Sequence, residues 1–189
     1  MENTNENENS NSPWQFLLSY VASDDQIRIL PYNRVIKRLK DGKEEFLRKL
    51  EEIYYIKKVK TAFNPNRKNH IALCIKGKWY KLETKEKTFS SKRDSLDVAI
   101  LQDKVLGPIL RIINIRADDN IFFVGGLQDP TTMEEYTTEK GNDTFFNLYP
   151  VDIKDLESIA DSGGVMPPKS TWFDPKLLSG LVLHDLQEE

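Results

Sequence analysis

The pattern of apolar and polar residues predicts a sheet with helices inserted between its strands. Residues 14–22 are mostly apolar and β-prone, residues 23–26 form a polar turn signal, and residues 27–30 resume a strand that Pro31 ends. This order predicts a hairpin. Its first strand is apolar on both faces, so we expect that strand to lie inside a sheet or at an edge that another surface covers.

A second hairpin and several single strands follow along the chain. Apolar residues alternate over 71–75, Lys76-Gly77 suits a tight turn, and residues 79–82 return as the second strand. Short runs rich in apolar residues then predict strands at 121–124, 144–149 and 181–183.

Helical periodicity appears in the segments between these strands. Apolar residues recur on one helix face over 46–54 and again over 101–112, where Gly107-Pro108 is expected to kink or divide the helix. Asp94 is expected to cap the start of this second helix, with Asp97 in its first turn. A helical or turn segment is expected around 130–139. Asp152 is expected to cap a further helix that ends at Gly163.

Together these elements indicate an α+β fold. We expect a single domain over residues 13–189, with a mixed, largely antiparallel sheet built from the two hairpins plus further strands and packed by three or so helices. Residues 1–12 are rich in Asn, Glu and Ser and almost free of apolar side chains, which predicts a disordered tail.

Composition and charge limit the class of protein. The chain has one cysteine, no apolar run long enough to span a membrane and no signal-peptide pattern, so we expect a cytoplasmic protein with no membrane partner. Residues 34–93 hold 19 Lys/Arg against 7 Asp/Glu, although the net charge of the whole chain is -3. Because this basic stretch lacks interleaved aromatics and an arginine-rich run, we expect no specific binding of nucleic acid.

Most groups that could carry chemistry have a structural explanation. His70, His184 and Cys74 do not stand at ligand spacing, so no metal site is predicted. Cys74 lies in an apolar strand, where a thiol is usually an inert core residue. Gly125-Gly126 follows a strand, as a phosphate-binding loop would. Without a Walker or dinucleotide motif, a strand end that needs positive φ explains it better.

The best candidate site is the irregular run from Gly163 to Lys176. Two consecutive prolines fix an extended course there and present Lys169, Ser170 and Thr171 together. An ammonium group and two hydroxyls beside exposed amides suit an anion or a phosphate group.

A structural explanation of the same run stays open beside the site hypothesis. Trp172 and Phe173 would then fill the core, and the segment would be a plug that carries no ligand. Asn33 and Arg34 follow the first predicted hairpin and form a second polar pair, which we include in the candidate anion site. No catalytic residue and no cofactor is predicted.

Several stretches resemble a known bacterial family. From Trp14 to Leu186 the chain is similar to the C-terminal half of domain of unknown function 1015. The matching stretches are Ile29–Val35, Gly77–Tyr80, Asp94–Val98, Ile100–Gln102, Phe123–Gly126, Leu148–Pro150, Val165–Leu177 and Ser179–Val182.

The resemblance implies two different functions. Members are variously labelled ParB/Spo0J-like or SerC-like, and some ParB-like proteins bind or hydrolyse nucleotides or phosphorylate free serine. The Asp-Gly-His-His-Arg motif of full-length members is absent from this sequence, so its role is not carried over. One hypothesis is therefore a structural or interaction half that completes a larger protein, with a separate N-terminal half or a second copy as partner. The alternative is the phosphate- or nucleotide-binding half of a ParB-like enzyme that acts on serine or phosphoserine.

Overall fold

The computed structural model describes residues 15–185, so the predicted tail at 1–12 lies outside the described residues. The chain divides into two compact units. The larger unit spans Ile29–Asp174, and the smaller combines Met1–Arg28 with Pro175–Glu189. No helix within residues 15–185 is long and apolar enough to cross a membrane.

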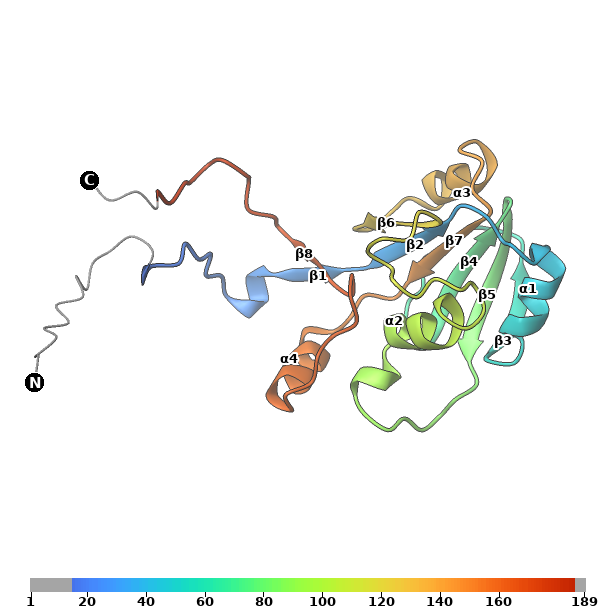
Figure 1. Ribbon diagram of the computed structural model, residues 1–189, viewed down its shortest axis with the longest axis horizontal. Helices are drawn as coiled ribbons and strands as arrows, with labels where there is room; N and C mark the ends of the chain where they lie inside the picture. Colours follow the sequence, from blue (N-terminus) through green and yellow to red (C-terminus); the bar gives the residue numbers. More distant parts are fainter. Residues whose placement is uncertain (1–14, 186–189) are drawn as a thin grey trace, which may run out of the picture. The chain divides into compact units, whose positions relative to one another are not determined.

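A six-stranded sheet forms the centre of the larger unit (Figure 1). Its strands follow the order β3-β5-β4-β7-β2-β6, and every neighbouring pair is antiparallel. The six strands are β2 (Tyr32–Ile36), β3 (Tyr54–Val59), β4 (His70–Ile75), β5 (Lys78–Thr84), β6 (Ile121–Gly125) and β7 (Thr144–Leu148). Two further strands, β1 (Arg28–Leu30) and β8 (Trp172–Asp174), pair as a separate two-stranded sheet.

Helices cover the sheet, which confirms the α+β prediction. They are α1 (Gly42–Leu50), α2 (Asp97–Ile100) with a π-helical continuation over Leu101–Leu106, α3 (Pro130–Thr138) and α4 (Ile153–Asp161). Asp129 and Asp152 start α3 and α4 as caps, accepting hydrogen bonds from the backbone amides of Thr131 and Lys154. Gly163 ends the last helix with a φ of 71°, as predicted.

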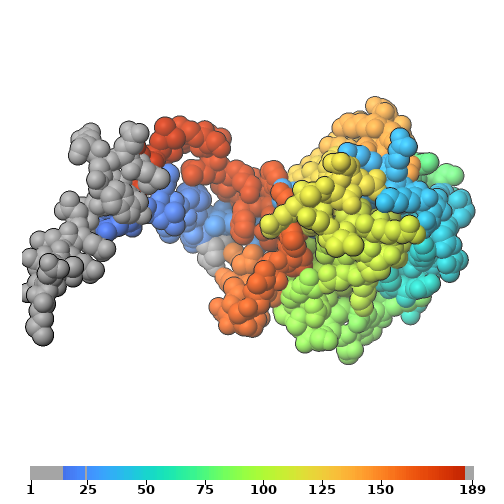
Figure 2. Space-filling model, in the orientation of Figure 1, coloured from blue at the N-terminus to red at the C-terminus, as the bar shows by residue number. Residues whose placement is uncertain are grey.

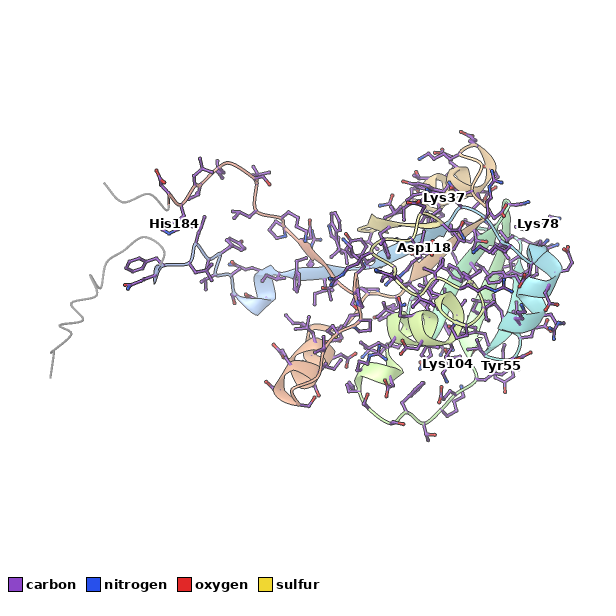
Figure 3. All side chains as sticks on the ribbon, in the orientation of Figure 1. Lys37, Tyr55, Lys78, Lys104, Asp118 and His184 are labelled. Atoms are coloured by element: carbon purple, nitrogen blue, oxygen red, sulfur yellow. The ribbon has the colours of Figure 1, made fainter. Side chains whose placement is uncertain are left out.

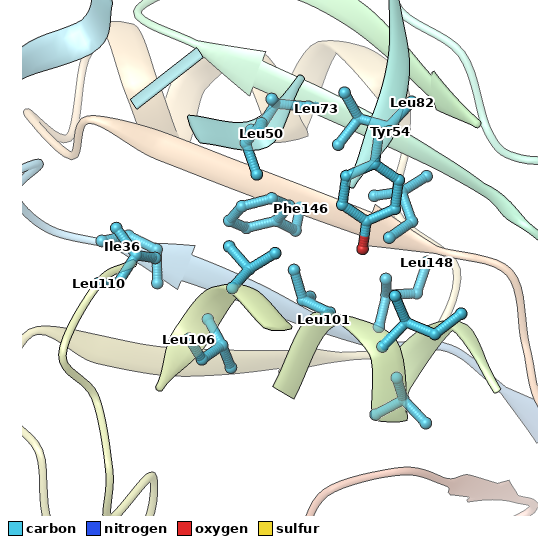
Figure 4. Packing of buried hydrophobic residues seen from close by; sticks show 14 of the residues in the cluster. Ile36, Leu50, Tyr54, Leu73, Leu82, Leu101, Leu106, Leu110, Phe146 and Leu148 are labelled. Atoms are coloured by element: carbon cyan, nitrogen blue, oxygen red, sulfur yellow. The ribbon is translucent and has the colours of Figure 1, made fainter. Parts of the chain in front are cut away.

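The two faces of the sheet carry two separate apolar cores. On one face α1, α2 and the π-helix pack against side chains such as Phe146 and Leu73 (Figure 4). The rings of Phe46 and Phe146 meet edge-to-face with centroids 6.3 Å apart. On the other face Met133 of α3 packs with Phe145 and its neighbours. The central strands are therefore buried on both sides, which explains why β4 and β7 have no exposed residue.

The prediction of a first hairpin was wrong. Residues 16–22 form no strand, and β1 pairs with β8. The chain continues past Pro31 directly into β2, a central strand that contains Asn33 and Arg34. The sequence did not predict this strand because Asn33 and Arg34 are polar, whereas buried strands normally have a nearly continuous apolar sequence.

Two helix boundaries also differ from the prediction. The first helix ends at Leu50, and Tyr54 begins β3, where the β-prone run Tyr54–Ile56 is stabilised by pairing with β5. The second α-helix begins at Asp97, and Asp94 does not cap it. The Asp97 carboxylate instead accepts a hydrogen bond from the backbone amide of Asn69 at 3.0 Å.

At the C-terminal end, residues 181–183 form no strand, contrary to the prediction. The short strand β8 lies within the run that was predicted to be irregular throughout. The second hairpin is confirmed as β4 and β5, joined at Lys76-Gly77. Strands β6 and β7 and helix α3 also lie where the sequence predicts them.

Candidate anion-binding site

Arg34 occupies a buried position on β2. It lies opposite Phe123 of β6 and Phe146 of β7 in the strand register, so its side chain shares their face of the sheet. Only 1% of the residue is exposed. Its guanidinium donates hydrogen bonds to backbone carbonyls alone, from Nη2 to Lys169 O at 2.9 Å and from Nη1 to Tyr32 O, and Nε has no partner.

The electrostatic setting of Arg34 is unfavourable for its charge. Burial lowers the pKa of Arg34 to about 9, and a smaller interaction with Tyr32 opposes that shift. No acidic side chain in residues 15–185 forms an ion pair with this guanidinium. Because an uncompensated buried charge is costly, a nearby anion would stabilise the protonated guanidinium.

Lys169 provides the second cation of the cluster. It follows Pro167-Pro168 and has a left-handed backbone with a φ of 57°. Its Nζ lies 5.4 Å from the ring centre of Tyr32 and 5.9 Å from that of Phe123. The guanidinium carbon of Arg34 lies 5.5 Å from the same Phe123 ring. Two cationic groups, 135 residues apart in the sequence, therefore contact one aromatic side chain.

An aromatic cluster holds this arrangement in place. Tyr32 contacts Phe123 and Trp172 edge-to-face, with centroid separations of 5.9 and 5.3 Å. Trp172 lies directly over Gly125, where a Cβ atom would be only 1.8 Å from the indole ring. Gly126 has the positive φ that the sequence predicted for this glycine pair, whereas Gly125 is required for the close approach of Trp172.

The remaining predicted site residues do not all join Arg34 and Lys169. Ser170 is buried, and its hydroxyl donates to the carbonyl of Pro167 within the same turn. Thr171 is half-buried in the next position. Asn33 points to the opposite face of the sheet from Arg34, because consecutive strand residues alternate.

Asn33 has a structural role at that position. Its side-chain amide donates to Gly126 O at 3.4 Å, and its side-chain oxygen accepts from the backbone amide of Leu148 at 3.1 Å. These bonds tie β2 to the end of β6 and to β7. Asn33 therefore does not lie beside Arg34 and Lys169, although the sequence-based prediction grouped the three residues in one candidate site.

An open cleft of about 620 Å³ lies beside β6 and includes Lys169. Figure 2 shows the yellow segment around residues 110–125 at the surface, and Figure 3 marks Asp118 in the same region. Arg34 does not line this cleft. Its lining residues are Ile115, Arg116, Asp118, Ile121, Phe122, Phe123 and Lys169. Sequence reasoning missed Arg116, because an isolated arginine in a loop gives no local signal.

A second buried polar cluster joins α2 and α4 to the loop that precedes β4. Asp155 is 4% exposed and pairs with Lys68 and, at 2.9 Å, with Lys92. Burial tends to raise the pKa of Asp155, but the two lysines hold it below its usual range. Asp97 borders the same small cavity, and its Oδ1 has no hydrogen-bond partner. Within residues 15–185, no group of three or more His, Cys, Asp and Glu side chains is placed to hold a metal ion.

The family described as "Protein of unknown function (DUF1015)" matches residues 1–99, just over half of the 189-residue chain. The chain belongs to this family. The match covers β1 to β5 and the start of α2, and therefore includes Arg34. Among curated proteins, no sequence matches this DUF1015 chain.

Several solved structures are similar to this DUF1015 chain in part. A mutant free serine kinase in complex with ADP gives a TM-score of 0.46 at 16% identity, and free serine kinase in complex with AMP gives 0.45 at 14%. Each comparison covers 79% of this chain and 55% of the other. SbnI with C-terminal truncation, from Staphylococcus aureus, gives 0.42 at 14% identity over 86% of this chain and 55% of the other. The chain thus spans about half the length of these structures, and similarity at this level assigns it no ligand.

Proposed function

We propose that this DUF1015 chain binds a small organic or inorganic anion, a phosphate or a carboxylate, through Lys169. The observation that supports this proposal is the pair of cations on the Phe123 ring. Among residues 15–185, no acidic side chain pairs with either cation, and one of the two lines an open cleft. An anion in that cleft would lie in a positive potential to which both groups contribute.

The two cations have different roles in this proposal. Lys169 is the contact residue, because it borders the cleft and its ammonium has three donors. Arg34 is a positioning residue, since it is buried and does not line the cleft. Its hydrogen bond to Lys169 O holds the left-handed turn in place, so that the lysine is presented to a ligand in one conformation.

The phosphate group connects this site with the ligands that the family resemblance implies. Nucleotides and phosphoserine both carry a phosphate that an ammonium group can bind. On this proposal the chain is the phosphate-binding part of a larger protein, and the reaction, if the whole protein has one, uses groups outside the cluster described above.

We expect Lys169→Gln to weaken phosphate binding about tenfold or more, since a hydrogen bond to a charged group contributes roughly 1.5–3 kcal/mol. Glutamine is uncharged, only one atom shorter than lysine, and has the same backbone strain at positive φ, so the free energy of unfolding should change by less than about 1 kcal/mol. Isothermal titration calorimetry with inorganic phosphate measures the affinity. The rise in melting temperature on adding phosphate measures how far binding stabilises the folded protein.

The matched control is Lys78→Gln, which removes the same charge from the opposite half of the sheet. Lys78 is exposed at the start of β5, and β4, β7 and β2 separate that strand from β6. This variant should bind phosphate as the wild type does. Equal weakening in both variants would mean that net charge alone drives the binding. A wild type that neither phosphate nor acetate stabilises would refute the anion site.

A second function has support from a different observation, the apolar surface of the smaller unit. Ten large apolar side chains between residues 16 and 21 and between residues 177 and 183 are exposed. Neither segment carries a charged residue, so two copies could bring identical segments together without electrostatic repulsion. We propose that a second copy of this chain covers these segments, with a separate N-terminal half as the competing partner.

We expect Leu17→Lys to convert a dimer into a monomer, because it introduces a charge into this apolar surface. Light scattering after size-exclusion chromatography measures the mass over a range of concentrations. Ile113→Lys is the control, since Ile113 is 86% exposed on the larger unit and Leu17 is 89% exposed. A wild type that stays monomeric at every concentration would refute self-association, as would a dimer that withstands Leu17→Lys.

A further inference from the structure

We propose that the ligand of the Lys169 site carries a single anionic group on an apolar, planar body, and that Arg116 is a second contact residue. This inference rests on the proposed anion site. It extends that site from one ammonium group to the whole cleft beside β6. It also predicts different affinities for ligands that share a phosphate group but differ in the rest of the molecule.

The size of the cleft argues for an organic ligand. Its volume of about 620 Å³ falls in the range of sites that hold cofactors and drug-sized molecules, roughly 300–1,000 Å³. A free phosphate ion would fill a small part of it. The remainder of the cleft would then stay wet, and the apolar side chains that line it would gain nothing from binding.

The lining of the cleft indicates the character of the ligand body. Four of its seven lining residues are apolar: Ile115, Ile121, Phe122 and Phe123. Ile115, Ile121 and Phe123 pack in the core on one face of the sheet and form an apolar wall of the cleft. Phe122 points to the opposite face, where its ring packs against Tyr136. A planar ring could pack against Phe123 in an offset or edge-to-face geometry.

The same wall disfavours a small polar body. The amino and carboxylate groups of phosphoserine would lose water wherever they lie against isoleucine or phenylalanine. The charged side chains that line the cleft are Arg116, Asp118 and Lys169. Arg116 and Lys169 can together bind one anionic group of the ligand. The carboxylate of Asp118 would repel a second anionic group.

Arg116 is suited to contact the anion directly. It is exposed, it lines the same cleft as Lys169, and it forms no ion pair with another residue in the described part of the chain. Its planar guanidinium can bind a phosphate or a carboxylate with two parallel hydrogen bonds, which a lysine cannot do. Arg34, in contrast, contacts the Phe123 ring without lining the cleft.

The test compares three probes that differ in the body attached to the phosphate: inorganic phosphate, phosphoserine and phenyl phosphate. Titration calorimetry at fixed ionic strength gives each dissociation constant. We expect phenyl phosphate to bind at least about tenfold more tightly than phosphoserine or inorganic phosphate, because only its ring gains from the apolar wall. Arg116→Gln should weaken phenyl phosphate about tenfold, whereas Lys78→Gln should leave its affinity unchanged.

The outcomes distinguish this inference from the anion site on which it rests. If phosphoserine or inorganic phosphate binds as tightly as phenyl phosphate, the apolar-body inference is wrong and the anion site stands. If none of the three probes binds, the anion site itself is refuted. If Arg116→Gln binds phenyl phosphate as the wild type does, Arg116 is not a contact residue.

Discussion

Replacing Gly125 with alanine is expected to displace the Trp172 indole and to abolish anion binding at Lys169. A Cβ atom on Gly125 would lie 1.8 Å from Cε3 of Trp172 and 2.4 Å from two further ring carbons, so the ring or the strand must move. Gly125 does not have a positive φ, so the effect is steric and not a backbone strain. Forcing extra atoms into a packed site costs roughly 1–3 kcal/mol of folding stability.

The effect on binding follows from the order of contacts around the site. Trp172 packs edge-to-face on Tyr32, and the Tyr32 ring lies beneath the Lys169 ammonium. Trp172 also lies close along the chain to the turn at Pro168-Lys169. A displaced indole therefore disturbs both the ring and the turn that position Lys169. Near-ultraviolet circular dichroism reports the loss of aromatic packing, and calorimetric titration with phosphate reports the loss of binding.

Gly107→Ala is the matched control for this substitution. Gly107 also lacks a positive φ, and apart from its neighbours in the chain the nearest atom to its Cβ position is the carbonyl oxygen of Gln102, at an ordinary contact distance of 3.8 Å. This variant should fold and bind phosphate as the wild type does. A Gly125→Ala protein with unchanged phosphate affinity would show that the packing of Trp172 does not position Lys169.

The parts of the fold that the sequence predicts correctly depend on local signals. The turn at Lys76-Gly77 lies between two strands, and Asp129 and Asp152 begin helices with a side-chain cap. Such signals act over a few residues, so they can be recognised without tertiary structure. The prediction of the first hairpin was wrong because an apolar run near the start of the chain has no local feature that indicates which strand it pairs with.

The candidate site was predicted in part for the same reason. The prolines before Lys169 indicated an extended course, whereas the structure has a turn at Pro168-Lys169, and Lys169 lines the cleft. The contact of Arg34 with Lys169 joins residues far apart in the sequence, and only the antiparallel register of β2 with β6 explains it. Nothing in the sequence indicated that the Ser170 hydroxyl donates to the carbonyl of Pro167, because that bond depends on the turn between them.

Asp97→Asn is expected to stabilise the protein at pH 8 and to leave its stability almost unchanged at pH 4. Burial raises the pKa of Asp97 from 3.8 to about 7, partly opposed by the backbone amide of Asn69 and the charge of Lys68. The folded protein therefore binds the Asp97 proton more tightly than the unfolded chain does. As the pH rises from about 4 to 7, the unfolded carboxyl ionises first, and the contribution of this group to stability falls.

The size of the effect follows from that difference in pKa. Each pKa unit corresponds to about 1.4 kcal/mol, so the penalty at pH 8 has an upper bound of about 4 kcal/mol. Asparagine avoids the penalty because it carries no charge, and its side-chain oxygen can still accept the hydrogen bond of Asn69.

Urea unfolding at pH 4 and pH 8 measures the free energy of unfolding of the variant and of the wild type. The contributions of all other titrating groups cancel in the difference between the two proteins. Asp94→Asn is the control, since Asp94 is partly exposed and its pKa is lowered by Ser91 and Arg93. That variant should gain no stability at pH 8. An Asp97→Asn protein less stable than the wild type at pH 8 would mean that the ionised carboxylate has a partner that outweighs its burial.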